Sequence, residues 1–407
     1  MVAFHFPPMA GSSGIQRTLR FVQQLPSFGW QPIVLTVNPR AYERTSTDLT
    51  RDIPVGTVVE RAFALDTARH LAVGQRYLAA MARPDRWVSW KFDAVRTGMR
   101  LIRRYRPAAI WSTYPIATAH LIGAELQRRS GLPWIADFRD PMAQEGYPSD
   151  PKDWQAFKVI EECAIRQAAC NTFTTPSAVR TYRERYPGAA SRIIQLENGF
   201  DEESFVAAET AGVERDALHP TALTLLHSGI VYPSERNPEH LIAALGQLHR
   251  AGQLPSRGLR LRFRAAVHDD LLQRLAAQHG VQAFVETLPP LPYREALAEM
   301  LRADALLVMQ GENCNEQVPA KVYEYLRAKR PILCLADPKG DTAAVMREAG
   351  VQAIAKLESV EAIKSLLPAF LQTVSEGSAR LSSADAIQGA SRMQRSAALA
   401  GLLQAAT

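Results

Sequence analysis

EQVPAKVYEYL, residues 316–326, follows an apolar run at Ala305–Met309 and precedes another apolar run. This order predicts a strand, a loop, a helix and a further strand. We expect Pro319 in the first helical turn, where the N–H that proline lacks would have no partner. Glu316 then lies in the loop and Glu324 inside the helix. Ligands bind outside the carboxyl ends of strands in open α/β sheets, so the stretch predicts one wall of a nucleotide-type site.

Apolar runs alternate with amphipathic segments along the rest of the chain, a pattern typical of parallel doubly wound sheets. In the first half we expect strands at Val2–Phe6, Ile33–Val37, 55–59, 108–113, 134–138, 172–175 and 193–196, with helices at 71–81, 92–105, 116–128 and 154–169. The pattern restarts at Leu223, and 407 residues are many for a single core. We predict an α/β protein with two Rossmann-like, doubly wound parallel-sheet domains that face a central crevice.

The expected domain borders follow changes in this pattern. We expect an N-terminal domain at 1–198, a linker at 199–220, a second domain at 221–380, and a C-terminal helix within 381–407 that packs back towards the first domain. The linker is inferred from the turn signal Asn198-Gly199, an acidic patch and weak apolar periodicity. The first strand is short, so we also expect it to begin one or two residues before Met1.

Charge indicates the kind of partner. The net charge of +6 and the pI near 9.2 favour polyanions. Arginines gather in the amphipathic segment Phe92–Arg106, which is either an ordinary solvated helix face or a contact with anionic lipid headgroups. Nucleic acid is disfavoured because no binding motif accompanies the charge. Without a membrane-spanning run or a signal-peptide pattern, we expect a cytoplasmic protein, peripheral at the inner membrane face.

Small residues follow the first expected strand. Gly11-Ser12-Ser13-Gly14 separates it from a predicted helix that begins near Ile15. Such a loop either cradles an anion with its backbone N–H groups or forms a plain serine-capped turn. It is neither a P-loop nor a G-x-G-x-x-G motif. The four cysteines form no C-x-x-C pair, and no pattern indicates a metal site.

Several motifs together resemble one family. They are FPPMAGSSGIQR at 6–17, NGFD at 198–201, HSG at 227–229, and Glu316 with Glu324. In this order they resemble bacterial family 4 glycosyltransferases, which are retaining enzymes with the two-Rossmann GT-B fold. The resemblance implies transfer of a sugar from a nucleoside diphosphate sugar to an acceptor hydroxyl with retention, without metal or cofactor.

The resemblance also implies roles for individual residues. Glu316 would contact the donor sugar near the reacting centre, and Glu324 would bind the ribose hydroxyls, since a carboxylate accepts two hydroxyl donors at once. Gly14 would lie against the diphosphate, with Ser12 and Ser13 on the acceptor side.

Two departures from the family pattern concern cations. The family places an Arg and a Lys after the first glycine of its second domain, whereas this chain has Gly229 and then only Arg236 near the second position. Arg236 and Lys321 would together supply the positive charge for the diphosphate. Arg139 stands where many relatives carry a histidine near the sugar. We interpret His227 as a packing or capping histidine.

Arg139 belongs to a charged group at the end of an expected strand, Asp137-Phe138-Arg139-Asp140. Unpaired charge is costly to bury, so two interpretations remain. The group forms a structural Arg–carboxylate pair, or it holds the acceptor with Asp140 or Asp137 as the base.

The acceptor would be a lipid-linked or surface polysaccharide intermediate if the basic helix meets a membrane, and soluble acceptors stay open. Two alternatives share this architecture. One is a nucleotide-sugar epimerase, and the other is a non-catalytic nucleotide-sugar binding protein, which the altered cation and histidine positions would fit.

Overall fold

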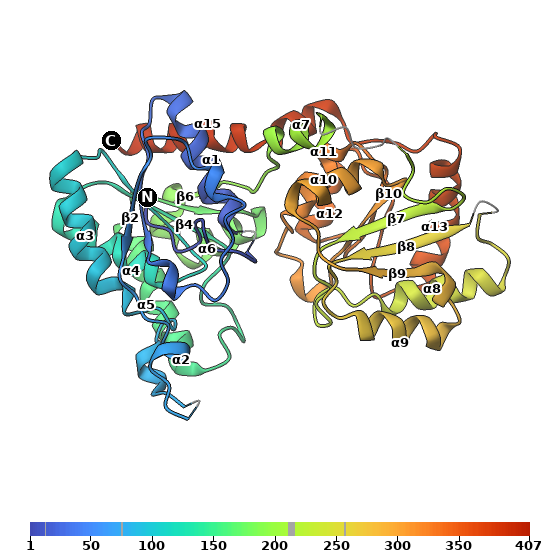
Figure 1. Cartoon of the computed structure of the whole chain (residues 1–407), viewed down its shortest axis with the longest axis horizontal. Coiled ribbons are helices and arrows are strands. Elements are labelled where there is room, and N and C mark those ends of the chain that lie inside the picture. Colours follow the sequence, from blue (N-terminus) through green and yellow to red (C-terminus); the bar gives the residue numbers. More distant parts are fainter. Residues whose placement is uncertain (13, 75, 211–215, 256–257) are drawn as a thin grey trace. The chain divides into compact units, whose positions relative to one another are not determined.

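The computed structural model describes residues 1–12, 14–74, 76–210, 216–255 and 258–407, which form two compact units (Figure 1). Unit 1 comprises Met1–Asn198 together with Arg392–Thr407, and unit 2 comprises Gly199–Ser391. Each unit has a parallel sheet covered by helices, so the predicted pair of Rossmann-like α/β domains is confirmed.

Unit 1 is built on two groups of parallel strands, β1-β2 and β3-β4-β5-β6. Its elements are α1 Gly14–Gln24, β1 Ile33–Val37, β2 Val58–Ala62, α2 Thr67–His70, α3 Trp90–Tyr105, β3 Ile110–Thr113, α4 Thr118–Ser130, β4 Trp134–Arg139, α5 Pro151–Gln167, β5 Cys170–Phe173, α6 Pro176–Arg185, β6 Ile193–Gln195 and α15 Arg392–Ala406. Helices α3, α4 and α5 pack in sequence against one another, while α1 packs against α15. Figure 1 shows α15 in red beside α1 in blue.

Val2 joins the two groups of strands. It bridges Leu35 of β1 and Ser112 of β3, both in the parallel sense. The expected strand Val2–Phe6 is therefore reduced to a bridging residue. Pro7-Pro8 follows at once, and prolines cannot donate the N–H groups that a central strand needs.

A cavity of about 530 Å³ lies beside Met1, with a mostly apolar lining that includes Ile33, Ile110 and Leu126. The terminal ammonium group of Met1 donates a hydrogen bond to the carbonyl oxygen of Ile33 at 2.6 Å. Burial lowers the pKa of this amine to about 5. The cavity thus adjoins the first residues of β1 and β3, at the edge opposite their carboxyl ends.

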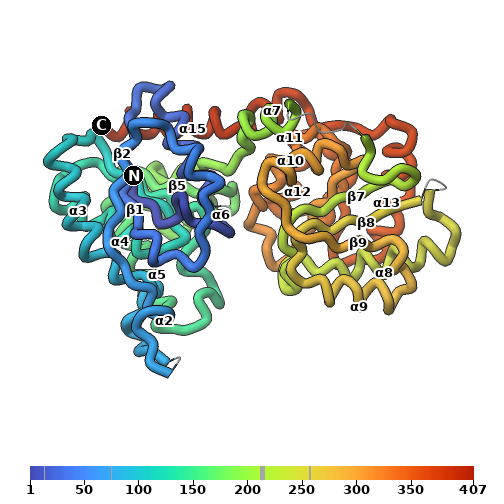
Figure 2. Tube along the Cα trace, in the orientation of Figure 1, coloured from blue at the N-terminus to red at the C-terminus, as the bar shows by residue number. Residues whose placement is uncertain are grey.

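Unit 2 has one parallel sheet of six strands in the order β12-β11-β10-β7-β8-β9. Figure 2 shows the neighbouring strands β7, β8 and β9 of this sheet. Its elements are α7 Glu202–Thr210, β7 Leu223–Ser228, α8 Glu239–Arg250, β8 Leu259–Arg264, α9 Asp269–His279, β9 Val285–Leu288, α10 Tyr293–Arg302, β10 Ala305–Met309, α11 Lys321–Ala328, β11 Ile332–Leu335, α12 Asp341–Glu348, β12 Ile354–Ala355, α13 Val360–Ser375 and α14 Ala384–Gly389. Helices α8, α9 and α13 pack together, as do α7, α10 and α11.

Alternate residues of β10 face the two helical layers of unit 2. Leu307 and Met309 belong to the apolar cluster with α8 and α13, whereas Leu306 and Val308 belong to the cluster with α10 and α11. All four side chains are buried. A strand that is buried on both faces has a continuous run of apolar residues, and this run allowed the strand to be predicted from the sequence.

The expected linker at 199–220 contains helix α7, which belongs to unit 2. The Asp201 carboxylate accepts a hydrogen bond from the Ser204 N–H at 2.9 Å and so caps the helix start. The acidic residues Glu202 and Glu209 both form ion pairs with Arg327 of α11. The acidic patch therefore belongs to a helix of unit 2 that packs on α10 through the buried Phe205 and forms ion pairs with α11, so the segment is more than the linker that the sequence predicted.

Three further local predictions differ from the structure. Of the helix expected at 71–81, the described residues form only the short 3-10 helix Ala79–Ala82; α2 ends at His70, and Gly74 has a left-handed φ of 57° that interrupts helical geometry. Pro319 precedes α11, which begins at Lys321. The C-terminal segment 381–407 holds two helices, of which α14 belongs to unit 2 and α15 to unit 1. No helix among the described residues is long and apolar enough to cross a membrane.

Candidate active site

The EQVPAKVYEYL stretch lies beyond the carboxyl end of β10, and its two glutamates differ in setting. Glu316 is exposed in the loop between β10 and α11. Glu324 lies in α11 and is half-buried. One Glu324 oxygen, Oε1, accepts a hydrogen bond from the Tyr293 hydroxyl at 2.8 Å, so α10 orients this carboxylate. The structure thus separates a loop carboxylate from a fixed helical one.

Lys321, the first residue of α11, contacts a histidine at the end of β7. Its Nζ lies 3.1 Å from His227 Nε2, while His227 Nδ1 lies 3.0 Å from the carbonyl oxygen of Leu307. A carbonyl only accepts, so we assign the ring proton to Nδ1, which leaves Nε2 to accept from the lysine. His227 is fully buried. Burial, and next the charge of Lys321, hold its pKa well below the usual value, so the ring is neutral.

Gly229 leaves the space that the lysine occupies. Its φ is 114°, and a Cβ at this position would lie 3.0 Å from Lys321 Nζ. Any other residue would therefore be strained and would displace the ammonium group. Ser228, just before it, donates its N–H to the buried Tyr325 hydroxyl at 2.8 Å, which ties β7 to α11.

Arg236 supplies a second cation on the loop after β7. Its Nε donates to Gln310 Oε1 at 3.2 Å, and its guanidinium lies over the Tyr232 ring at 5.4 Å from the centroid. Gln310 follows β10 directly and donates to the Cys314 carbonyl. Arg236 is therefore fixed where β7 and β10 end.

The two cations affect each other. Burial lowers the pKa of Lys321 to about 7, with a further contribution from the Arg236 charge, while Glu324 opposes the shift. Cations held together in a partly buried position favour the binding of an anion, because an anion removes their repulsion. Of the predicted donor residues, Gly229, Arg236, Lys321 and Glu324 belong to this part of unit 2.

In unit 1, the small-residue loop meets the end of β4. Ser12 Oγ lies 3.0 Å from His5 Nδ1 and accepts from the Gly14 N–H at 3.2 Å. A Cβ on Gly14 would lie 2.6 Å from His5 Nδ1 and 2.7 Å from Arg139 Nη1. Gly14 is thus required for the close approach of α1 to Arg139. Ser13 lies outside the described residues.

Arg139 has an unusual backbone. Its φ is 63°, and the pairing of β4 with β5 shifts register between Asp137 and Arg139. Its carbonyl accepts from both the N–H and the hydroxyl of Thr174, which holds this conformation. Asp140 comes next and is exposed. Non-glycine residues in the left-handed region gather at functional sites, and the bulge sets the Arg139-Asp140 pair apart from the regular strand.

Asp137 has a structural role, which corrects its expected place on the acceptor side. It is fully buried, and Arg17 of α1 donates to both of its oxygens at 2.9 and 2.8 Å. The hydroxyls of Thr113 and Thr172 donate to the same carboxylate. Burial favours the neutral acid, but the Arg17 charge and these bonds keep the Asp137 pKa below its usual value. The Arg–carboxylate pair therefore exists, with Arg17 rather than Arg139.

Comparison with known proteins identifies the first half of the chain. Residues 13–199 match the family model of the glycosyl transferase 4-like domain. These residues form a glycosyltransferase domain. The predicted family 4 recognition and the enzyme class are thereby confirmed on this domain. Two units, each with a parallel sheet, also agree with the predicted GT-B fold class. No curated protein sequence matches the chain.

Solved structures with similar folds cover nearly all of this glycosyltransferase. HepE of Anabaena in complex with UDP has 14% identity and a TM-score of 0.66, with 99% of each chain covered. Sucrose-phosphate synthase of Thermosynechococcus elongatus has 13% identity and a TM-score of 0.63, covering 99% of this chain and 98% of that one. The trehalose 6-phosphate synthase of Burkholderia multivorans has 13% identity and a TM-score of 0.62, covering 99% and 97%. At this identity the likeness shows the fold alone.

Two contacts in the candidate site were not predicted from the sequence. His227 was interpreted as a packing or capping histidine, and its contact with Lys321 through Nε2 was not foreseen. Its position directly before Ser228-Gly229 at a strand end was the available signal. Arg17 was not singled out, because its partner Asp137 lies 120 residues away.

The basic helix α3 buries its apolar stripe and exposes its arginines. Val95 and Leu101 are buried, whereas Arg100 and Arg104 are exposed. Arg96 forms an ion pair with Asp93 at 2.9 Å. Phe92 is 77% exposed and thus adds an apolar side chain to the outward face.

Proposed function

We propose that this glycosyltransferase moves a sugar from a nucleoside diphosphate sugar to an acceptor hydroxyl with retention at the anomeric carbon. The supporting observation is the pair of cations, Lys321 and Arg236, at the carboxyl ends of β7 and β10. A leaving diphosphate is an anion of the right kind for them, and preorganised cations stabilise the charge that develops as the glycosidic bond breaks. The UDP complex of HepE is a precedent within this fold.

In this proposal the remaining residues of unit 2 place the donor. Glu324 accepts hydrogen bonds from the ribose hydroxyls, and its bond from Tyr293 keeps it oriented. Gly229 keeps the backbone close to the diphosphate, beside Lys321. Glu316, exposed in the loop, contacts the sugar near the reacting centre.

Unit 1 handles the acceptor in this proposal. Asp140 is the candidate base for the acceptor hydroxyl, since it is exposed and its neighbour Arg139 is fixed by the bulge in β4. Gly14 and Ser12 line the adjoining loop, and the N–H groups at the start of α1 suit an anionic group.

We further propose that turnover needs no metal, because Lys321 and Arg236 carry the charge that a divalent ion would otherwise supply. Dialysis against EDTA should leave the rate unchanged. Loss of activity that returns on adding Mg²⁺ or Mn²⁺ would contradict this part of the proposal.

The decisive experiment incubates the protein with a panel of nucleoside diphosphate sugars and follows free diphosphate, with and without a membrane extract as the source of acceptor. Release that depends on the extract supports a transferase, and NMR of the product then compares its anomeric configuration with that of the donor. A changed sugar without any acceptor would indicate an epimerase. Tight binding without release or change would indicate a binding protein.

We place the reaction in the synthesis of cell-surface polysaccharide or glycolipid, at the cytoplasmic face of the inner membrane. The support is the exposed arginine face of α3 with Phe92. Flotation with vesicles that contain anionic lipid should recover the protein, and neutral vesicles should recover much less. Replacing Arg100 and Arg104 by Glu should abolish the difference; an unchanged recovery would argue against contact through α3.

A further inference from the structure

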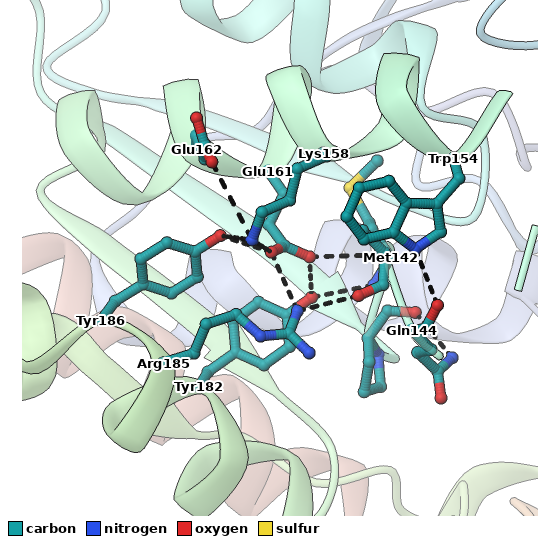
Figure 3. A network of polar contacts seen from close by, with 11 residues as sticks. Met142, Gln144, Trp154, Lys158, Glu161, Glu162, Tyr182, Arg185 and Tyr186 are labelled. Atoms are coloured by element: carbon teal, nitrogen blue, oxygen red, sulfur yellow. Dashed lines mark hydrogen bonds and ion pairs between the residues drawn. The ribbon is translucent and has the colours of Figure 1, made fainter. Parts of the chain in front are cut away.

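A buried carboxylate lies behind the segment that follows Asp140. Glu161 of α5 is fully buried and accepts hydrogen bonds from the hydroxyls of Tyr182 and Tyr186, from Lys158 and from Arg185 (Figure 3). We call these five residues the Glu161 cluster. Burial alone would favour the neutral acid, but the tyrosine hydroxyls and the other donors keep the pKa of Glu161 below its usual value. The carboxylate is thus ionised and fully engaged.

The Glu161 cluster forms hydrogen bonds with the backbone of the 141–144 segment. The Ala143 N–H donates to Glu161 Oε2 at 3.1 Å, and the Met142 N–H donates to the Tyr182 hydroxyl at 2.9 Å. Arg185 donates to the Ala143 carbonyl at 2.8 Å. Figure 3 shows Met142 beside Tyr182 and Glu161.

A further bond continues along the same segment. The Trp154 indole N–H of α5 donates to the Gln144 carbonyl at 2.8 Å. Four backbone donor or acceptor groups in 142–144 are therefore held by side chains of α5 and α6. Gln144 also pairs with the backbone of Tyr147 in an isolated antiparallel bridge. Irregular backbone held this way has one conformation only as long as its side-chain partners stay in place.

We propose that Glu161 is a positioning residue for the transfer reaction: through Tyr182 and the 141–144 segment it holds Asp140 and Arg139 in their working geometry. This inference rests on the proposed function of Asp140 and Arg139. Arg139 keeps a left-handed backbone, and such a conformation persists only where the surroundings over-determine it. Thr174 fixes one side of the bulge, and the Glu161 cluster fixes the chain just beyond it.

Two tyrosines of the cluster provide a matched test. Tyr182 and Tyr186 each donate one hydroxyl to Glu161, but only Tyr182 also accepts from the 141–144 segment. Tyr182→Phe and Glu161→Gln should lower kcat by roughly tenfold or more while the Kd for UDP stays the same, because misplacing a reacting group slows chemistry without touching the donor residues of unit 2. Tyr186→Phe should leave kcat within about twofold of the wild type, since it preserves the segment's contacts.

Amide exchange supplies a readout independent of activity. The Ala143 N–H should exchange faster in Glu161→Gln and the Met142 N–H faster in Tyr182→Phe, with the Tyr186→Phe rates unchanged. Thermal melts would give the Tm of each variant, so that every assay is run below its unfolding transition. Faster exchange with unchanged kcat, unaltered exchange, or an equal loss of kcat in Tyr186→Phe would each overturn the inference. If the wild type transfers no sugar at all, the proposed function is wrong. Amide exchange would even then show whether the Glu161 cluster holds the 141–144 segment.

Discussion

Lys321 Nζ lies 3.1 Å from His227 Nε2, and a Cβ on Gly229 would come within 3.0 Å of the same nitrogen. The ammonium group is thus held between a neutral imidazole and a residue with no side chain. Arg236 adds a second positive charge nearby and depresses the pKa of both Lys321 and His227. This arrangement holds the lysine side chain in place before any ligand arrives.

Lys321→Ala should weaken UDP binding by roughly 10- to 100-fold, the range expected for loss of a hydrogen bond from a charged donor. Isothermal titration calorimetry would measure the Kd. Lys364→Ala is the matched control, because this lysine lies on α13 and forms an ion pair with Glu361 in the same helix. Equal affinities of Lys321→Ala and wild type would remove Lys321 from the donor site.

The affinity for UDP should fall as pH rises above the Lys321 pKa of about 7. Diphosphate favours the ammonium form, so binding must take up a proton once the free lysine has lost it. The decline should approach ~tenfold per pH unit until the pKa of the complex is reached. Lys321→Arg stays charged throughout and should lack this decline, while the titration of UDP itself is common to both proteins. Parallel pH profiles would contradict the assignment.

The same pKa shift makes a prediction for stability without ligand. Between about 7 and 10.5 the unfolded chain holds a proton that native Lys321 has released. The free energy of unfolding should therefore gain a contribution as pH rises across this range, and the gain should be missing in Lys321→Met. Urea denaturation at several pH values would measure it.

Gly229→Ala should cost roughly 1–3 kcal/mol of stability, because alanine is strained in the left-handed region that Gly229 adopts. It should also weaken UDP binding, since the added methyl group meets Lys321 Nζ. Gly188→Ala is a suitable control, as a Cβ there meets nothing within 4 Å. Wild-type affinity in Gly229→Ala would show that the lysine has room to move.

Asp137 and Asp140 should respond oppositely to the same substitution. Asp137→Asn breaks a buried ion pair with Arg17 and should destabilise unit 1 by roughly 3–5 kcal/mol. Asp140→Asn should leave stability nearly unchanged and lower turnover, since this side chain is exposed. A stable but inactive Asp137→Asn protein would reverse the two assignments.

An apolar extension before Met1 should stabilise unit 1. Adding Val-Ile-Val would replace a buried amine, whose pKa is lowered to about 5, and fill the cavity between the starts of β1 and β3. A net gain of ~1 kcal/mol would raise Tm by about 2–4 °C. A Gly-Ser-Gly extension removes the amine but fills little of the cavity, so equal melting temperatures would show that filling contributes nothing.

Strands could be predicted where a continuous apolar run marks them in the sequence. Residues 305–309 and 332–335 are buried on both faces of a parallel sheet, and their continuous apolar runs revealed β10 and β11. Helix α7 was missed because its partners are distant in the sequence: it packs on α10 through Phe205 and pairs with Arg327 of α11, more than a hundred positions away. The helix expected at 71–81 was predicted from apolar residues that mostly lack packing partners: Val73, Leu78 and Met81 are exposed.

The sequence indicated several residues of the candidate site, but it did not indicate the residues that they contact. Lys321 and Glu324 stand within one short stretch, and Arg236 follows a strand end, so local pattern sufficed to find them. The contact of Lys321 with His227 spans 94 positions, and that of Arg17 with Asp137 spans 120. Such pairings are set by strand order in the sheet, which no local window contains. For that reason Asp137 was assigned to the acceptor although it serves the core.

The return of α15 to unit 1 has a consequence for engineering. The chain leaves unit 1 after Asn198 and re-enters it at Arg392, and Arg395 donates to the Asn198 carbonyl at 3.2 Å. Within unit 2, Phe200 likewise bridges Ser391. The exit and the re-entry thus lie side by side, and residues 199–391 form one continuous insertion. A different second unit could therefore be exchanged as a single cassette through two neighbouring junctions, leaving unit 1 and its helix α15 intact.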